Sequence, residues 1–289
     1  MRNCIRIVTW GGLGDVLLAT PTLRALKERE ACGKLIVYCL SWPHYEIYLH
    51  NPYIDILRPP GMLNRFERQL MKRFRLFRLD TPAYGLLHPS LLYTTRASEI
   101  IGEMFDVDTK DKRLMLFLTE EEQQIARQLI TPYKVPVAIQ IIGRCSKNKL
   151  WPHSNWTELV RRNPQYTFIQ LGTSEEPLIN GVVDLRGLPL RISLGVLKWV
   201  RSFVGIDSVL AHATNVFGTP GVVIFGPSTP IVWGHPNNKN LFAGLPCAPC
   251  IEILASAPCP YALPCMTTIS TATVERALRE QVAKTSPKP

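Results

Sequence analysis

The stretch from residue 202 to residue 227 has the sequence SFVGIDSVLAHATNVFGTPGVVIFGP. Two short apolar runs, 202–206 and 221–225, enclose a segment whose apolar residues recur at helical spacing and which ends at Gly218. Apolar strands joined by a helix are typical of a parallel sheet that is covered on both faces. This stretch therefore predicts a strand, a helix and a second, parallel strand.

The same alternation continues on both sides of this stretch. The other expected strands are 4–9, 35–40, 137–142, 166–171 and 182–185, and the other expected helices are 15–30, 119–130, 155–162 and a C-terminal helix capped by Ser270. Pro21 marks a start or kink in the first of these helices, and Pro132 and Pro136 bracket a linker. Since 289 residues fit two cores better than one, we expect an α/β protein with two domains, 1–134 and 135–289.

The composition is that of a globular protein with a positive charge of +10. No apolar run is long enough to span a membrane, and the N-terminus lacks a secretory pattern, so we expect a cytoplasmic protein. Much of the excess charge lies between Arg58 and Arg78, where basic residues such as Arg65 and Arg68 alternate with apolar ones. This segment is either a solvated helix face or an amphipathic surface for a phosphorylated glycan, an anionic lipid surface or a nucleic acid.

A glycine-rich turn, 10–14, follows the first strand and ends at Asp15. A dinucleotide-binding pattern fails on spacing, because Leu17 stands where the third glycine belongs. Gly12 and Gly14 would still let an acceptor or a phosphate approach the backbone. Asp15 is either a general base for an acceptor hydroxyl or a helix-start acid favoured by the helix dipole.

Two further segments place polar residues after strands of the second half. Lys149 lies on the loop after strand 137–142 and is either a ligand of a diphosphate or a surface lysine beside a packing tryptophan. Asp207 and Ser208 begin the helix after strand 202–206, which predicts an anion site. His212 is one turn further along the same helix face and is either part of this site or structural.

Four cysteines lie within 19 residues: Cys247, Cys250, Cys259 and Cys265. Four thiolates are the ligand set of a tetrahedral structural metal site for zinc or iron. Free thiols, or disulfides in an oxidising compartment, are the alternatives. A closed set of four ligands leaves no position for catalysis.

Together these motifs resemble the family of lipopolysaccharide heptosyltransferases and their relatives, glycosyltransferase family 9. The matching segments, in order, are Gly14-Asp15 with Thr20-Pro21-Thr22-Leu23-Arg24-Ala25-Leu26, then Lys149-Leu150-Trp151-Pro152, then Asp207-Ser208 with His212, then Phe225-Gly226-Pro227-Ser228-Thr229-Pro230. Order and spacing agree over nearly the whole chain. The resemblance implies a GT-B fold, in which two Rossmann-like domains with parallel sheets face a cleft.

The resemblance also implies an inverting transferase without a catalytic metal. The C-terminal domain would bind a nucleotide sugar such as ADP-heptose, and the N-terminal domain would bind an anionic glycolipid acceptor. Asp15 becomes the general base, and the donor site would comprise Lys149, Glu175 or Glu176, Asp207, Ser208, His212 and Gly226. Gly12, Gly14, Arg65 and Arg68 would serve the acceptor or its phosphates. Related heptosyltransferases that glycosylate proteins hold an iron with four cysteines, which favours iron as one option here.

The chain departs from the family pattern at three places. Val209 replaces a glycine after Asp-Ser, Ser228-Thr229 replaces Thr-Asp, and the N-terminal domain is short. These departures keep two alternatives open, a nucleotide-sugar-binding scaffold without transfer activity and a transferase that acts on protein hydroxyls. A nucleic-acid partner is not expected, because it would leave Asp15 and the Lys149 loop unexplained.

Overall fold

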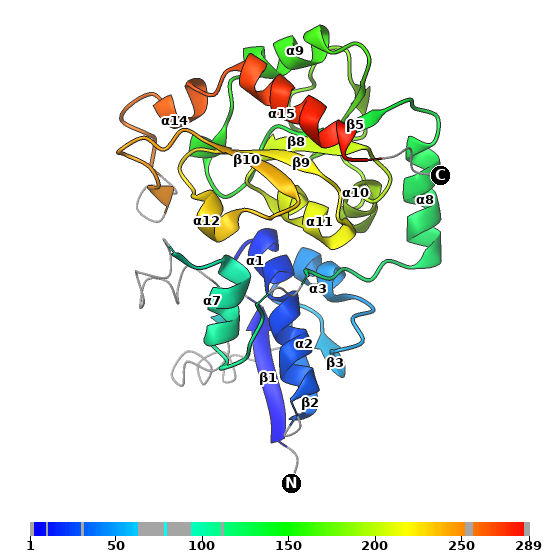
Figure 1. Ribbon diagram of the computed structural model, residues 1–289. Helices are drawn as coiled ribbons and strands as arrows, with labels where there is room; N and C mark the ends of the chain where they lie inside the picture. Colours follow the sequence, from blue (N-terminus) through cyan, green and yellow to red (C-terminus); the bar gives the residue numbers. More distant parts are fainter. Residues whose placement is uncertain are drawn as a thin grey trace. The chain divides into compact units, whose positions relative to one another are not determined.

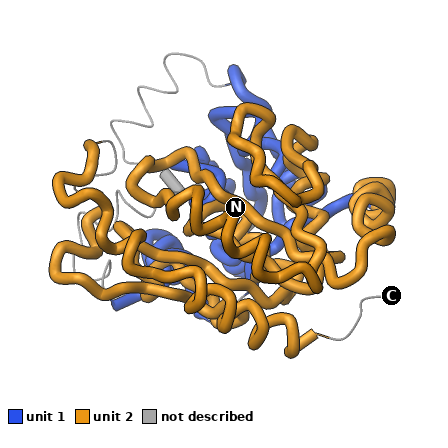
Figure 2. Tube along the Cα trace, turned by 90° about the horizontal axis from the view of Figure 1, so that it is seen from above, with its two compact units in different colours: residues 1–119 blue, residues 120–289 orange. Residues whose placement is uncertain are grey.

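The computed structural model describes residues 3–9, 11–29, 32–62, 78–79, 94–110, 113–251 and 257–285. The chain forms two compact units, residues 1–119 and 120–289 (Figures 1 and 2). The division precedes the boundary expected between residues 134 and 135, because helix α8 (Glu120–Ile130) packs on the second unit. In that contact Arg191 binds Glu122 at 2.5 Å.

The first unit is a parallel sheet with helices. Its elements are β1 (Asn3–Thr9), α1 (Leu13–Leu18), α2 (Thr20–Glu28), β2 (Cys32–Tyr38), α3 (Trp42–Tyr48), β3 (Ile56–Arg58), β4 (Arg78–Leu79) and α7 (Ala97–Glu103). The strand order is β3-β2-β1-β4. The expected helix 15–30 is divided at Ala19, and Pro21 lies in the first turn of α2 as its fixed φ favours.

Buried hydrogen bonds from helix α3 hold both ends of the turn between β1 and α1. Tyr48 of α3 donates its hydroxyl to the carbonyl of Val16 in α1 at 2.8 Å. Thr9, the last residue of β1, bonds the His44 ring at 2.9 Å. These contacts attach α3 to both ends of the glycine-rich turn, so the backbone before Asp15 has a defined path.

The second unit contains the larger sheet. Its elements after α8 are β5 (Pro136–Gln140), the 3-10 turn η1 (Lys147–Lys149), α9 (His153–Arg162), β6 (Thr167–Gln170), β7 (Val183–Asp184), α10 (Leu190–Val196), β8 (Ser202–Ile206), α11 (Val209–Phe217), β9 (Gly221–Phe225), α12 (Pro230–Trp233), β10 (Asn238–Phe242), α14 (Pro264–Thr267) and α15 (Thr271–Ala283). Helices α9 and α15 cover one face of the sheet, and α10 and α11 cover the other (Figure 1). The expected strands and helices of this half are confirmed, including the Ser270 cap of α15.

All strand pairs of this sheet are parallel, in the order β10-β9-β8-β5-β6-β7. The chain runs outward from β5 through β6 and β7, and then returns to place β8 on the other side of β5. Strands β5 and β8 therefore border a topological switch point, and ligands of such sheets bind outside the carboxyl ends of the strands there. The fold thus selects the loops after β5 and β8 as the candidate site.

Some elements of the second unit were not expected from the sequence. Six of the seven residues of helix α10 are buried, from Arg191 to Val196, so its sequence lacks the exposed polar face that makes a helix recognisable. Strand β10 begins with the polar run Asn238-Lys239-Asn240 at the sheet edge, which has no strand-like alternation. No helix among the described residues is long and apolar enough to cross a membrane.

Candidate functional site

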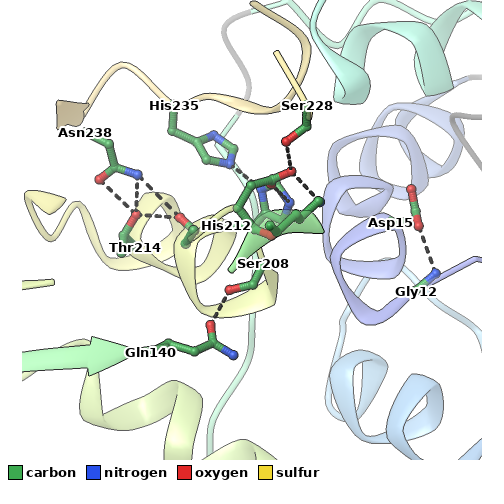
Figure 3. Close-up of polar contacts among 12 residues, drawn as sticks. Gly12, Asp15, Gln140, Ser208, His212, Thr214, Ser228, His235 and Asn238 are labelled. Carbon is green, nitrogen blue, oxygen red and sulfur yellow. Dashed lines mark hydrogen bonds and ion pairs between the residues drawn. The ribbon is translucent and has the colours of Figure 1, made fainter. Parts of the chain in front are cut away.

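Three loops converge beyond the switch point of the second sheet. The Lys149 ammonium lies 2.6 Å from Oδ2 of Asp207. The hydroxyl of Ser228, which is labelled in Figure 3, donates to the same oxygen at 2.7 Å. Lys149 follows β5, Asp207 follows β8 and Ser228 follows β9, so neighbouring strands bring together residues far apart in the sequence. Lys149 is 7% exposed, which excludes the surface-lysine alternative.

The lysine and the aspartate stabilise each other's charged form. Burial opposes the charge of Lys149, but the Asp207 carboxylate outweighs it and raises the lysine pKa above its usual value. Burial likewise opposes the charge of Asp207, and Lys149 and His212 hold the carboxyl pKa below its usual value. The site therefore keeps a buried ammonium and a buried carboxylate at neutral pH.

The tryptophan beside Lys149 explains why this loop enters the interior. Trp151 packs edge-to-face on Trp156 of α9, with ring centroids 4.9 Å apart, and its indole N–H donates to the carbonyl of Ile269 at 2.8 Å. Both rings belong to the hydrophobic core of the unit. The Lys-x-Trp-Pro motif thus inserts its tryptophan into the core, which directs the lysine toward the strand ends.

The N-terminus of α11 is open toward the same region. Ser208 is the N-cap residue, yet its side chain makes no capping hydrogen bond and instead contacts Oε1 of Gln140 at the end of β5. The backbone N–H groups of the first turn therefore lack a side-chain cap and suit an anion. Val209, which replaces the family glycine, is the first helical residue.

His212 lies one turn into α11 and is buried. Its Nε2 is 3.7 Å from Oδ1 of Asp207, and its Nδ1 is 2.9 Å from Nε2 of His235 (Figure 3). Burial lowers the pKa of His212 to about 4, although the nearby Asp207 carboxylate acts in the opposite direction. His235 was not expected from the sequence, because it lies in a loop outside the four motifs.

The candidate base Asp15 belongs to the first unit. Its Oδ2 accepts a hydrogen bond from the Gly12 N–H at 2.8 Å, so the carboxylate closes the first turn of α1. Gly11 has φ +82, and a Cβ there would lie 2.6 Å from the same oxygen. The turn therefore requires glycine at position 11 for the carboxylate to sit where it does. Arg65 and Arg68 lie outside the described residues.

Comparisons with known proteins agree with this architecture. A glycosyltransferase family 9 protein of Veillonella parvula has a TM-score of 0.72 at 16% identity, covering 97% of both chains. The Escherichia coli glycosyltransferase TibC, described as iron-containing and dodecameric, has a TM-score of 0.73 at 17% identity, over 98% of this chain and 76% of that one. It has also been solved with ADP-D-beta-D-heptose. The chain has the fold of the family 9 glycosyltransferases.

Sequence comparison supports the same relationship over part of the chain. Lipopolysaccharide heptosyltransferase 1 of Pseudomonas aeruginosa is 28% identical over 131 residues. The match covers 40% of this chain and 37% of that protein, so it spans well under half of either. No family model matches the chain.

Within the family 9 fold, Glu175 and Glu176 follow the end of β6. The Glu176 carboxylate lies over Gly172 and accepts the Thr173 N–H at 2.9 Å, and burial raises its pKa. Its second oxygen, Oε2, is buried without a hydrogen-bond partner among the described residues. Glu175 is exposed and bonds Ser174 at 2.8 Å. Of these two glutamates, Glu176 is therefore the one with a buried carboxylate oxygen that has no hydrogen-bond partner among the described residues.

Gly226 serves the packing of the cysteine-rich segment. A Cβ at this position would collide with the sulfur of Met266 and lie 3.1 Å from that of Cys265, so glycine lets α14 approach the end of β9. The N–H groups of Cys250 and Ile251 both donate to the carbonyl of Pro227. This contact connects the segment to the loop that carries Ser228.

A second connection reaches the Lys149 loop. The Asn148 amide donates to the Ala257 carbonyl at 2.8 Å and accepts from the Cys259 N–H at 3.1 Å. Asn148 is buried and adjacent to Lys149 in η1. The segment thus bonds two of the three loops that form the site.

All four cysteines of this segment are free thiols. Burial, with Cys247 and Cys259 nearby, raises the pKa of Cys250, and burial with the three other thiols raises the pKa of Cys265 to about 11. The neighbouring thiols thus add to burial in disfavouring the thiolates of Cys250 and Cys265. Even so, no group of three or more His, Cys, Asp or Glu side chains among the described residues is placed to share one ion.

Proposed function

We propose that this protein is an inverting glycosyltransferase that transfers heptose from ADP-heptose to a lipopolysaccharide-core or other envelope glycan acceptor. The observation that carries the proposal is the buried Lys149, Asp207 and Ser228 constellation at the switch point of a family 9 fold. A protein of related fold has been solved with ADP-D-beta-D-heptose. The proposed setting is the cytoplasmic face of a membrane.

The second unit would hold the donor through its strand-end loops. The first-turn N–H groups of α11 and the Lys149 ammonium would face the diphosphate, whose negative charge grows as it leaves. Glu176 has a buried oxygen without a partner among the described residues, which suits a ribose hydroxyl. Asp207 would keep Lys149 charged and oriented.

The first unit would supply the base. An acceptor hydroxyl oxygen attacks the anomeric carbon, the bond from that carbon to the diphosphate oxygen breaks with its electron pair, and the hydroxyl proton passes to Asp15. Attack from the face opposite the leaving group inverts the anomeric configuration. Gly12 and Gly14 would admit the acceptor near the carboxylate, and the basic residues Arg65 and Arg68 would attract its anionic groups.

Calorimetric titration with ADP-heptose, ADP-glucose, UDP-glucose and GDP-mannose tests the donor assignment. We expect binding of ADP-heptose alone, lost in Lys149→Ala, with Lys239→Ala as an exposed-lysine control that binds normally. Binding of none of the four would refute the proposed function. Transfer is then followed with heptose-deficient lipopolysaccharide or a protein as acceptor, and Asp15→Asn should abolish it while leaving donor affinity intact.

The scaffold alternative has its own support in the structure. Lys149 is already neutralised by Asp207, and Val209 adds a side chain at the anion-binding end of α11. If the protein is a scaffold, the wild type binds ADP-heptose but transfers it to neither acceptor. Val209→Gly tests this alternative directly, because recovery of transfer in that variant would identify the valine as the change that removed activity.

We also propose that Cys247, Cys250, Cys259 and Cys265 hold one structural iron or zinc. The four-thiol donor set and the mutual effect of the thiols on their pKa values support this, since a cation would relieve that repulsion. A related fold is described as iron-containing. Elemental analysis should find about one metal per chain in protein purified without chelators and none in Cys250→Ser/Cys259→Ser, and a metal-free wild type would refute the site.

A further inference from the structure

The His212 ring lies between two polar partners, a carboxylate near one ring nitrogen and a second imidazole near the other. Its Nε2 faces Oδ1 of Asp207 at 3.7 Å, and its Nδ1 lies 2.9 Å from Nε2 of His235. His212 is on α11, and His235 follows α12, so the second ring reaches the site from a different loop (Figure 3). Both histidines are buried.

The ring carries a single proton at neutral pH. Burial lowers the pKa of His212 to about 4, so the imidazolium form is absent near pH 7. One ring nitrogen is then a donor and the other is an acceptor. The neighbours of the two nitrogens decide which arrangement is lower in free energy.

The charge of Asp207 distinguishes the two arrangements. Its carboxylate stays ionised because Oδ2 accepts from both Lys149 and Ser228. A proton on Nδ1 of His212 would turn the Nε2 lone pair toward this carboxylate, which is repulsive. A proton on Nε2 points an N–H at Oδ1 and leaves Nδ1 free to accept from His235.

We propose that His235 is a positioning residue that donates from its Nε2 to Nδ1 of His212 and so fixes the ring of the Nε2–H tautomer with its N–H toward Asp207. The fixed His212 ring then helps to hold the Asp207 carboxylate beside the N-terminus of α11, where the proposed function places the donor diphosphate. The ligand in this inference rests on that proposed function, whereas the tautomer does not. A neighbouring network, Thr214 with Asn238 at 2.9 Å, anchors β10 just after the His235 loop.

Nitrogen-15 NMR of the histidine rings tests the tautomer directly in the full chain. The chain has six histidines, so the His212 signals are assigned by their loss in His212→Gln. We expect wild-type His212 to be protonated at Nε2 at pH 7. His235→Leu removes the donor, so the Nδ1 resonance of His212 should shift toward that of a nitrogen that accepts no hydrogen bond, whereas His235→Gln places an amide N–H near the same position and should restore the wild-type resonance.

Matched measurements separate this role from general packing. His153→Leu removes an exposed histidine at the start of α9 and should leave the His212 signals unchanged. ADP-heptose affinity should fall roughly tenfold in His235→Leu and recover to within about threefold in His235→Gln. The inference is overturned if His212 is protonated at Nδ1 in the wild type or if its Nδ1 resonance is unchanged in His235→Leu. If the tautomer result holds but wild type binds no ADP-heptose, the proposed function fails instead.

Discussion

Lys149 and Asp207 form a buried ion pair in which each residue depends on the other. We predict that Lys149→Met or Asp207→Leu alone lowers the free energy of unfolding of the second unit by about 3–5 kcal/mol, because each leaves an unpaired buried charge. The double variant Lys149→Met/Asp207→Leu should regain most of this loss and still bind no donor. Denaturant unfolding and calorimetry check the two outcomes.

An exposed pair supplies the control for this prediction. Lys239 and Glu280 lie 3.6 Å apart with half of each side chain exposed. Lys239→Ala should therefore change the unfolding free energy by less than about 1 kcal/mol. If the double variant binds ADP-heptose as well as wild type does, Lys149 serves only the stability of the unit and its donor role is wrong.

Gly11 is a second residue for which a small substitution has a specific consequence, because an added Cβ would meet the Asp15 carboxylate. Gly11→Ala would force a left-handed conformation on alanine and place its Cβ against the Asp15 carboxylate. Gly61 has a similar φ of +87, but a Cβ there would meet no atom within 4 Å, so Gly61→Ala carries the backbone cost alone, about 1–2 kcal/mol. We predict that Gly11→Ala costs more than Gly61→Ala and also lowers kcat at least tenfold, measured by transfer assay and thermal unfolding.

Several residues of the candidate site were predictable from the sequence, and His235 was not. Lys149, Asp207 and Ser208 stand in motifs whose spacing relative to strands indicates a strand-end site. For Asp15 both interpretations stay open, since its carboxylate caps α1 and its role as a base stays a prediction. His235 lies in a loop whose sequence carries no signal, and its value comes from a contact across 23 residues of chain.

At the scale of elements, the 3-10 turn η1 joins the cysteine-rich segment to the loops of the candidate site. Asn148 bonds both the Ala257 carbonyl and the Cys259 N–H, while the next residue is Lys149. One side chain therefore connects the segment to the residue next to the lysine. Gly226 and Pro227 make the equivalent connection on the side of Ser228.

We predict that Asn148→Ala exposes the segment and weakens donor binding together. Loss of both hydrogen bonds should raise the rate of Cys259 modification by a thiol reagent at least fivefold and weaken ADP-heptose binding roughly tenfold. Asn155→Ala on α9 is the matched control and should change neither. Faster modification with unchanged affinity would show that the segment and the donor site are independent.

For the second unit as a whole, stability should depend on pH through His212. Its pKa is about 4 when folded and near 6.5 when unfolded, so the unfolded chain binds more protons between these values and stability falls as pH falls through this window. We predict a loss of roughly 1–2 kcal/mol between pH 7 and pH 5 from this residue. Denaturant unfolding at both pH values should show that loss in wild type and in His153→Gln, and a smaller one in His212→Gln. An equal loss in all three would contradict the assignment.

Local patterns in the chain suffice for the class of the fold and for most of its second sheet. Apolar runs such as 202–206 and 221–225, with a helix stopped at Gly218, leave few alternatives to a parallel sheet, because buried strands and amphipathic helices need those periodicities. The same logic fails for α10 and β10. A helix buried at six of its seven residues and an edge strand rich in polar residues show no contrast between an apolar face and a polar face.

The tertiary structure alone decided which residues contact each other in the candidate site and between the helices. The order β10-β9-β8-β5-β6-β7 brings Lys149 and Ser228 to the carboxylate of Asp207. The spacing of these residues along the chain does not reveal that order. The boundary between the units moved to residue 119 because α8 packs on α10, a contact between segments about seventy residues apart. Periodicity is a property of neighbours in sequence, whereas an ion pair, a tautomer and a domain boundary depend on free energies of contacts that form only when distant segments pack.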